Sequence, residues 1–335
     1  MIIISKYWQQ RNEELLHLQL KKSETWYRDL AENYLSALKR VESELDTFYS
    51  SLDSITLAEA KKHLTGAELK DFKRKIKYYL TDNVRDEWKK ELLVLKDRYR
   101  VSRLQAMQVQ IRQELEVLGK MEVEGLESLS WDIYTDNYYR ELYEVTKTLG
   151  VAKVFDKIDT RKVELLNKSG WSNDGKTFSD RIWGRQETVS NFLNSELVQS
   201  IQLGEDPQKI INKMAKTFNT NKKNAGRLIM TESAYYASES QKQAYSELSV
   251  EQFQFIATLD DRTSAICQEM DLQIMKMSEY EVGVTAPPLH PFCRSTTIPY
   301  FDDNYTTRFS RLNDGNILYV DKDISYSEWS KKYLK

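Results

Sequence analysis

The 335-residue chain is poor in the residues that interrupt helices, with 11 glycines and 5 prolines. Together these make up about 5% of the chain, against roughly 12% in an average protein. Because few helix breakers leave few positions for turns, the composition predicts long helices and a mainly α fold.

Cysteine and long apolar runs are also scarce. The two cysteines are too few for a disulfide scaffold and favour a reducing compartment. The apolar run at the N-terminus, Met1 to Ile4, is shorter than the roughly 7–15 residues of a secretory signal. No stretch approaches the roughly 18–20 apolar residues of a membrane span. We therefore expect a protein that starts in a cytoplasm, with no membrane partner.

The sequence contains none of the short motifs that mark common enzymes. It has no Walker-type phosphate loop, no G-x-G-x-x-G, no H-E-x-x-H and no G-x-S-x-G. The glycines are scattered, so no glycine-rich loop could cradle a phosphate in the usual way. These observations predict a protein that is not an enzyme and holds no cofactor.

The first 150 residues have the periodicity of long helices, which predicts a helical N-terminal arm folded as a hairpin or small bundle. One helix is expected over 5–52, because apolar residues recur there at alternating spacings of four and three. A short helix over 57–64 follows Thr56 as its cap. A second long helix is expected over 70–118, ending at Gly119 and Gly125, and a third over 131–149, ending at Gly150.

Residues 151–248 are predicted to form a helical middle region. One helix is expected from Arg181 to about Leu203, capped by Ser179 or Asp180 and stopped by Gly204. Asp206 and Pro207 begin a helix to Phe218, and a further helix spans 222–248. Six basic residues lie between Pro207 and Thr231 with no acidic residue among them: Lys209, Lys213, Lys216, Lys222, Lys223 and Arg227. They are the candidate contact for DNA or an acidic partner, although a solvated helix face explains them as well.

Residues 249–302 are predicted to form a small α+β module. Strands are expected at 253–259, 272–275 and 295–300, with a short helix at 266–270. Residues 303–335 form a tail with a strand at 316–320 and an end helix at 327–333. Nine acidic residues face only three basic ones between 246 and 302. Since this balance repels a phosphate backbone, any DNA contact is expected in the basic run instead.

Three of the chain's few reactive side chains, Cys267, His290 and Cys293, fall in this module. One interpretation is a zinc site, which needs a fourth ligand from Asp260 or Asp261. Another is a Cys/His nucleophile pair. It is disfavoured because the prolines around His290 predict an extended chain, in which His290 and Cys293 point to opposite faces. The third is structural, with buried thiols and with His290 and Arg294 bonded to backbone carbonyls.

Several short motifs occur in order along this part of the chain. They are Thr231-Glu232, then Asp260-Asp261-Arg262-Thr263 followed three residues later by Cys267, and then Pro287-Pro288-x-His290-Pro-x-Cys293-Arg294. Phe178-Ser-Asp-Arg-Ile-Trp183 and Gly204 precede them. Over roughly 178–301 the chain resembles the phage head morphogenesis family, the minor head proteins related to the F protein of phage Mu.

The resemblance implies a minor capsid protein of a tailed phage that joins the procapsid with the portal protein and acts in head morphogenesis or DNA delivery. It implies further contacts with scaffold or major capsid protein, and a place inside the capsid or at the portal vertex, after assembly in the host cytoplasm. The family-motif residues with an implied structural role are Glu232, Asp261, Arg262, Thr263, Pro288, His290, Cys293 and Arg294.

This chain departs from the family at two positions. Members often carry cysteines where this chain has Ser264 and Ser295, and the loss of two ligands weakens the zinc hypothesis. Two alternative functions stay open. One is a DNA-binding ejection protein that uses the basic run, and the other is a Cys/His-dependent hydrolase or toxin domain.

Overall fold

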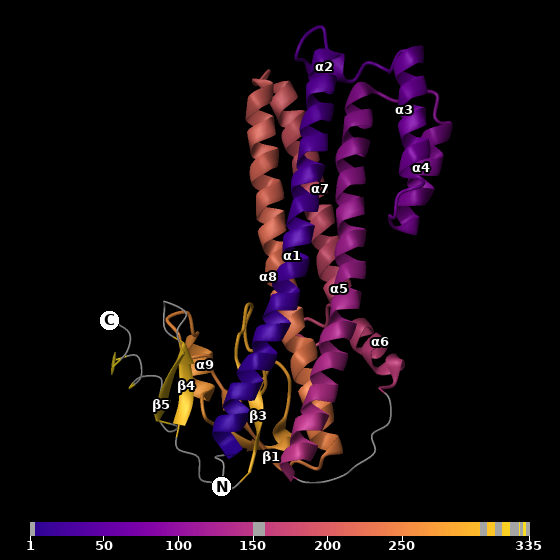
Figure 1. Cartoon of the computed structure of the whole chain (residues 1–335). Helices are drawn as coiled ribbons and strands as arrows, with labels where there is room; N and C mark the ends of the chain where they lie inside the picture. The colour runs from indigo at the N-terminus through magenta and orange to yellow at the C-terminus, as the bar shows by residue number, and fades with distance from the viewer. Residues whose placement is uncertain are drawn as a thin grey trace. The chain divides into compact units, whose positions relative to one another are not determined.

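The computed structural model describes residues 4–149, 158–301, 307–311, 317–321, 328 and 331–332. Its contacts divide the chain into two compact units (Figure 1). Unit 1 gathers Met1–Thr25, Glu127–Thr177 and Arg227–Lys335, and unit 2 gathers Trp26–Leu126 and Phe178–Gly226. Each unit therefore combines stretches that are separated in the sequence.

The expected fold class, mainly α with a small α+β module near the C-terminus, is confirmed. The helices are α1 Ile4–Ser50, α2 Leu57–Ala60, α3 Gly66–Tyr79, α4 Asp86–Asp97, α5 Arg103–Leu149, α6 Thr160–Lys168, α7 Phe178–Gln202, α8 Pro207–Glu247 and α9 Ala265–Met270. The strands are β1 Gln252–Ile256, β2 Ile274–Lys276, β3 Thr296–Tyr300, β4 Thr307–Arg311 and β5 Ile317–Asp321. Within the described residues, no helix is long and apolar enough to span a membrane.

The single helix expected over 70–118 is wrong, because this stretch is divided among α3, α4 and the first part of α5. The helix expected over 131–149 is the last part of α5. Gly119 and Gly125 lie inside α5 and end no helix. A Cβ at Gly119 would overlap the ring of Trp183, and one at Gly125 would overlap the ring of Trp26. Both glycines therefore mark places where a tryptophan packs against the helix backbone.

Two helices expected between 207 and 248 are in fact the one continuous helix α8. Asn221, between the two expected helices, is buried, and its amide donates to Gln186 Oε1 at 2.9 Å. The helix expected from Arg181 begins earlier, at Phe178, so neither Ser179 nor Asp180 is its cap. Gly204 follows the end of α7 with φ of +60°, the left-handed conformation that glycine adopts without strain.

Unit 2 has an apolar cluster and a buried polar one. Residues of α3, α4 and α5 form the apolar cluster around Trp88 and Leu92. In the polar cluster, Glu122 of α5 accepts hydrogen bonds from Tyr34 Oη at 2.5 Å and from Gln186 Nε2 at 2.8 Å, and it pairs with Arg185. Burial raises the pKa of Glu122, and the Arg185 cation opposes that shift. These bonds connect α1, α5 and α7 within the unit.

Unit 1 contains an antiparallel sheet with the strand order β2-β1-β3. On β1, Ile256 packs in a cluster with Trp8 of α1 and Val145 of α5. The preceding residue, Phe255, packs with Cys267 and Cys293. Because successive residues of a strand point to opposite faces, the two cysteines lie on the face of the sheet turned away from these helices.

A second pair of strands follows the sheet in unit 1. β4 and β5 are antiparallel, with Thr307 opposite Asp321 and Arg311 opposite Ile317. The strand expected at 316–320 is confirmed as β5, whereas β4 was not predicted. The end helix expected at 327–333 falls largely outside the described residues.

Candidate functional site

Cys267 lies in the first turn of α9, which begins directly after the Asp260–Thr263 turn. Ser264 caps the helix, and its hydroxyl accepts a hydrogen bond from the Cys267 amide at 3.4 Å. A serine cap offers this oxygen to the free amides of a first helical turn. The cap therefore fixes the backbone from which the Cys267 thiol projects, and this thiol is only 1% exposed.

His290 and Cys293 lie in a tight turn before β3. The Cys293 amide donates to the His290 carbonyl at 3.1 Å, and Phe292 between them has φ of +61°. Thr231 of α8 accepts a hydrogen bond from the Phe292 amide at 3.3 Å, which fastens the turn to that helix. The extended chain expected here, with His290 and Cys293 on opposite faces, is therefore wrong.

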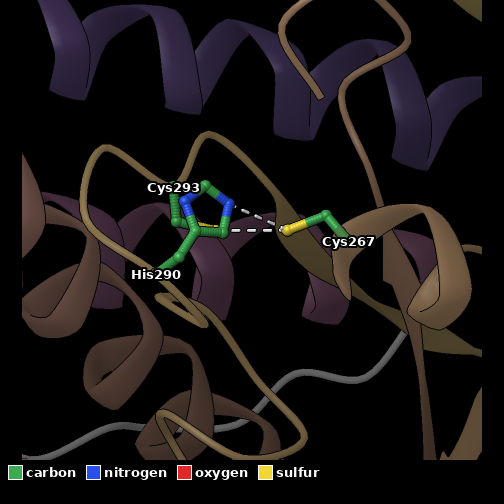
Figure 2. A group of neighbouring side chains, drawn as sticks. All are labelled: Cys267, His290 and Cys293. Carbon is green, nitrogen blue, oxygen red and sulfur yellow. Dashed lines mark hydrogen bonds between the residues drawn. The ribbon is translucent and has the colours of Figure 1, made fainter. Parts of the chain in front are cut away.

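The turn brings all three predicted side chains together. Cys267 Sγ lies 3.3 Å from His290 Nε2 and 3.7 Å from Cys293 Sγ. One ligand atom from each residue lies within 4.8 Å of the other two. In Figure 2 the imidazole and the Cys293 side chain come from the loop and face the Cys267 sulfur at the start of α9. The cluster thus joins two parts of the module that are more than 20 residues apart in sequence.

The aspartate proposed as a fourth ligand is used elsewhere. Asp260 pairs with Arg294, whose Nη2 donates to Asp260 Oδ1 at 2.8 Å, and it also accepts from the Arg262 amide at 2.9 Å. Its neighbour Asp261 is exposed. Arg294, for which the sequence suggested bonds to backbone carbonyls, therefore bonds to a carboxylate. The Asp260–Arg294 pair ties the turn before α9 to the loop before β3.

The two thiols differ in acidity because they share a hydrogen bond. The bond from Cys267 lowers the pKa of Cys293 to about 6, although burial opposes this shift. The same bond raises the pKa of Cys267, and burial raises it further. Hydrogen bonds of the Ser295 side chain lower the pKa of both thiols.

Other family-motif residues hold the surrounding backbone. Glu232 is buried and accepts from the indole Nε1 of Trp171 at 3.1 Å. Trp171 stacks on Tyr235 with ring centroids 5.1 Å apart. Trp171 was not predicted to have this role. Its position in a polar, turn-rich stretch of the sequence is the signal that could have identified it. Thr263 bonds back to the Asp260 turn, Arg262 is largely exposed, and Pro288 follows a cis peptide bond.

The Cys267 thiol and the His290 imidazole lie closer together than the sequence suggested for a Cys/His nucleophile pair. His290 Nδ1 also lies 2.8 Å from the Pro291 carbonyl oxygen, which orients the ring. A nucleophile must still reach its substrate, and Cys267 is covered by the apolar cluster around Phe255. The geometry therefore favours a role inside the fold over attack on a substrate.

The basic run lies along α8. At 100° per residue, Lys209, Lys213, Lys216 and Lys223 recur on one side of the helix. Lys222 lies off this stripe, and Arg227 belongs to unit 1.

Part of this stripe is neutralised. Lys213 Nζ lies 2.8 Å from Glu196 Oε2, and Lys209 Nζ lies 3.9 Å from Glu205 Oε1. In the described part of the chain, Lys216 and Lys223 form no ion pair. Two of the four lysines of the stripe are therefore free to meet an external anion.

Comparison with known proteins gives one family match. Searches of curated proteins and of solved structures found no match. Residues 191–298 match the model of the family described as Phage Mu protein F like protein. This range contains the Thr231-Glu232 pair, the Asp260 turn and the three clustered side chains, so the resemblance seen in the motifs is confirmed. Over residues 191–298, about a third of its length, the chain therefore carries a Phage Mu protein F-like region.

Proposed function

We propose that this protein is a minor head protein of a tailed bacteriophage that associates with the portal protein and acts in head morphogenesis. The observation that carries the proposal is the family match over residues 191–298. The proposed place is the capsid interior or the portal vertex, reached after assembly in the host cytoplasm. Scaffold and major capsid proteins are further proposed partners.

The way in which the motif residues are used supports a structural role over a catalytic one. Glu232 anchors Trp171, Thr231 fastens the turn at Phe292, and Asp260 pairs with Arg294. Each of these contacts joins two parts of the chain to each other. Residues that hold backbone segments together in this way preserve a shape, which is what a protein built into an assembly needs.

The direct test is co-purification from procapsids. The portal protein of the phage that encodes this chain would be tagged, and the captured procapsids and mature virions would be examined by mass spectrometry. We expect this chain in both particles, with fewer copies than the major capsid protein. Absence from purified virions together with failure to co-purify with portal would overturn the proposal.

The lysine stripe of α8 favours DNA contact as a second candidate function. Lys216 and Lys223 carry it, because both are without an ion pair among the described residues. Binding through them would be independent of sequence and would weaken as salt rises. Replacing both by Gln should lower the salt dependence by up to about two charges, whereas Lys222→Gln, off the stripe, should change it less. No binding at low salt would end this candidate.

A further inference from the structure

We infer that Cys267, His290 and Cys293 together bind one thiophilic divalent cation, zinc by their chemistry, and that the bound ion clamps α9 to the turn before β3. Thiolate and imidazole are the ligands that zinc prefers in proteins. The inference goes beyond the proposed head function, since it concerns how the Mu F-like region is held together. It stands on the geometry of the cluster, its surroundings and its charge.

Two of the three spacings in the cluster, both from the Cys267 sulfur, already match a tetrahedral ion. With Zn–S near 2.3 Å and Zn–N near 2.0–2.1 Å, tetrahedral angles put two sulfurs about 3.8 Å apart and a sulfur and a nitrogen about 3.6 Å apart. The observed distances are 3.7 Å between the sulfurs and 3.3 Å between Cys267 Sγ and His290 Nε2. The third pair, His290 Nε2 and Cys293 Sγ, lies within 4.8 Å, so an ion fits once this pair closes by up to about 1.2 Å.

The imidazole is oriented as in a metal site. His290 Nδ1 lies 2.8 Å from the Pro291 carbonyl oxygen, so the proton resides on Nδ1 and donates to this acceptor. The lone pair of Nε2 then points at the Cys267 sulfur. A hydrogen bond from the second ring nitrogen to a backbone carbonyl is the usual way in which proteins fix a metal-binding histidine.

The charge and the burial of the two cysteines determine which kind of ion fits the cluster. Two thiolates neutralise one divalent cation, and a neutral complex is compatible with the 1% and 3% exposure of the two cysteines. Magnesium and calcium prefer oxygen ligands, so they fit this set poorly. The sulfurs pack against Phe255 and Ala257, which leaves them out of reach of a substrate and makes a structural clamp the fitting role.

Three protein ligands leave a fourth position. Ser295 is buried and follows Cys293 by two residues, and its hydroxyl oxygen can fill this position. A cysteine at position 295 would offer a thiolate instead of a hydroxyl. Ser295→Cys is therefore expected to bind zinc more tightly, whereas substitutions of the three ligands are expected to weaken binding.

The test is metal binding by the full-length chain, purified under reducing conditions and stripped of metal. Zinc would be titrated in competition with a chromophoric chelator, and cobalt would be titrated to detect cobalt–thiolate absorption. We expect one ion per chain and a higher thermal midpoint with zinc. Cys267→Ser, Cys293→Ser and His290→Asn should each weaken binding beyond the roughly 10–100-fold that follows loss of an outer-shell partner. His63→Asn, an exposed histidine outside the cluster, is the matched control.

Ser295→Cys keeps the test decisive if the other variants fold poorly. It should bind zinc more tightly than the natural chain and should strengthen the cobalt–thiolate absorption. The inference is overturned if the natural chain binds no stoichiometric ion while both thiols are free, or if Cys267 and Cys293 are found joined in a disulfide that excludes metal. It is also overturned if Ser295→Cys binds no better. None of these results depends on whether the protein is found in virions, so the two proposals fail separately.

Discussion

Two glycines in unit 2 are predicted to respond differently to the same substitution. In Gly119→Ala the new Cβ would lie 2.9 Å from Trp183 Cη2 and closer still to another ring atom. The Arg85 guanidinium also packs over this ring, 4.0 Å from the ring centroid. In Gly184→Ala, the matched control, the Cβ would meet no atom within 4 Å.

The magnitudes follow from two terms. Replacing a mid-helix glycine by alanine contributes about 1 kcal/mol of helix propensity at both positions. Forcing a methyl group into the occupied space at Gly119 costs about 1–3 kcal/mol. We therefore expect Gly184→Ala to raise the free energy of unfolding by about 1 kcal/mol and Gly119→Ala to leave it unchanged or lower it by up to about 2 kcal/mol.

Urea denaturation followed by circular dichroism gives both free energies. The same pair of substitutions would then be measured in a Trp183→Ala background, where the obstructing ring is gone. There Gly119→Ala should become stabilising, and the non-additivity would report the contact directly. If Gly119→Ala stabilises the natural chain as much as Gly184→Ala does, the close approach of α7 to the backbone of α5 is not a constraint and the reasoning fails.

Three further predictions concern hydrogen bonds. Tyr34→Phe removes a buried donor to the Glu122 carboxylate and should cost about 1.5–3 kcal/mol of unfolding free energy; an unchanged urea midpoint would contradict it. Ser102→Ala removes the hydroxyl that caps the start of α5 and should cost about 1 kcal/mol, whereas Ser102→Asp should retain most of the stability. Burial would raise the pKa of Asp260, but Arg294 outweighs it and lowers the pKa, so the contribution of Asp260 is complete above about pH 4 and is lost as pH falls through the lowered value. Asp260→Asn should therefore lose stability less steeply in acid, and a parallel pH profile for both proteins would refute this.

The helix boundaries show what the sequence could and could not give. The apolar periodicity between 76 and 118 runs on across two helix ends, so the pattern alone merged three helices. One of these ends was nevertheless marked, because Ser102 with Gln105 has the spacing of a capping box and forms the reciprocal hydrogen bonds at the start of α5. The start of α4 at Arg85 has no side-chain cap. This cap signature would have separated α4 from α5, where glycine and proline are absent.

The sequence identified the three residues of the candidate site, but it did not predict that the chain brings them together. Scarcity made Cys267, His290 and Cys293 conspicuous in the sequence. Their convergence depends on Phe292, which has a positive φ, and on the bond from its amide to Thr231 of α8. A non-glycine residue in this conformation is uncommon, so the proline-rich sequence favoured the extended chain. A contact with a helix 61 residues away in sequence has no local signal.

The division of the chain into two units limits how the matched region, residues 191–298, could be exchanged by recombination. The family match begins in unit 2 and ends in unit 1, so a boundary of sequence similarity is not a boundary of folding here. Trp8 and Val145 cover one face of the sheet, and both lie outside the matched residues. A genetic exchange that transferred only residues 191–298 between phages would separate the sheet from the helices that shield it. Recombination that keeps this sheet covered must therefore carry the segments of Trp8 and Val145 together with the matched residues.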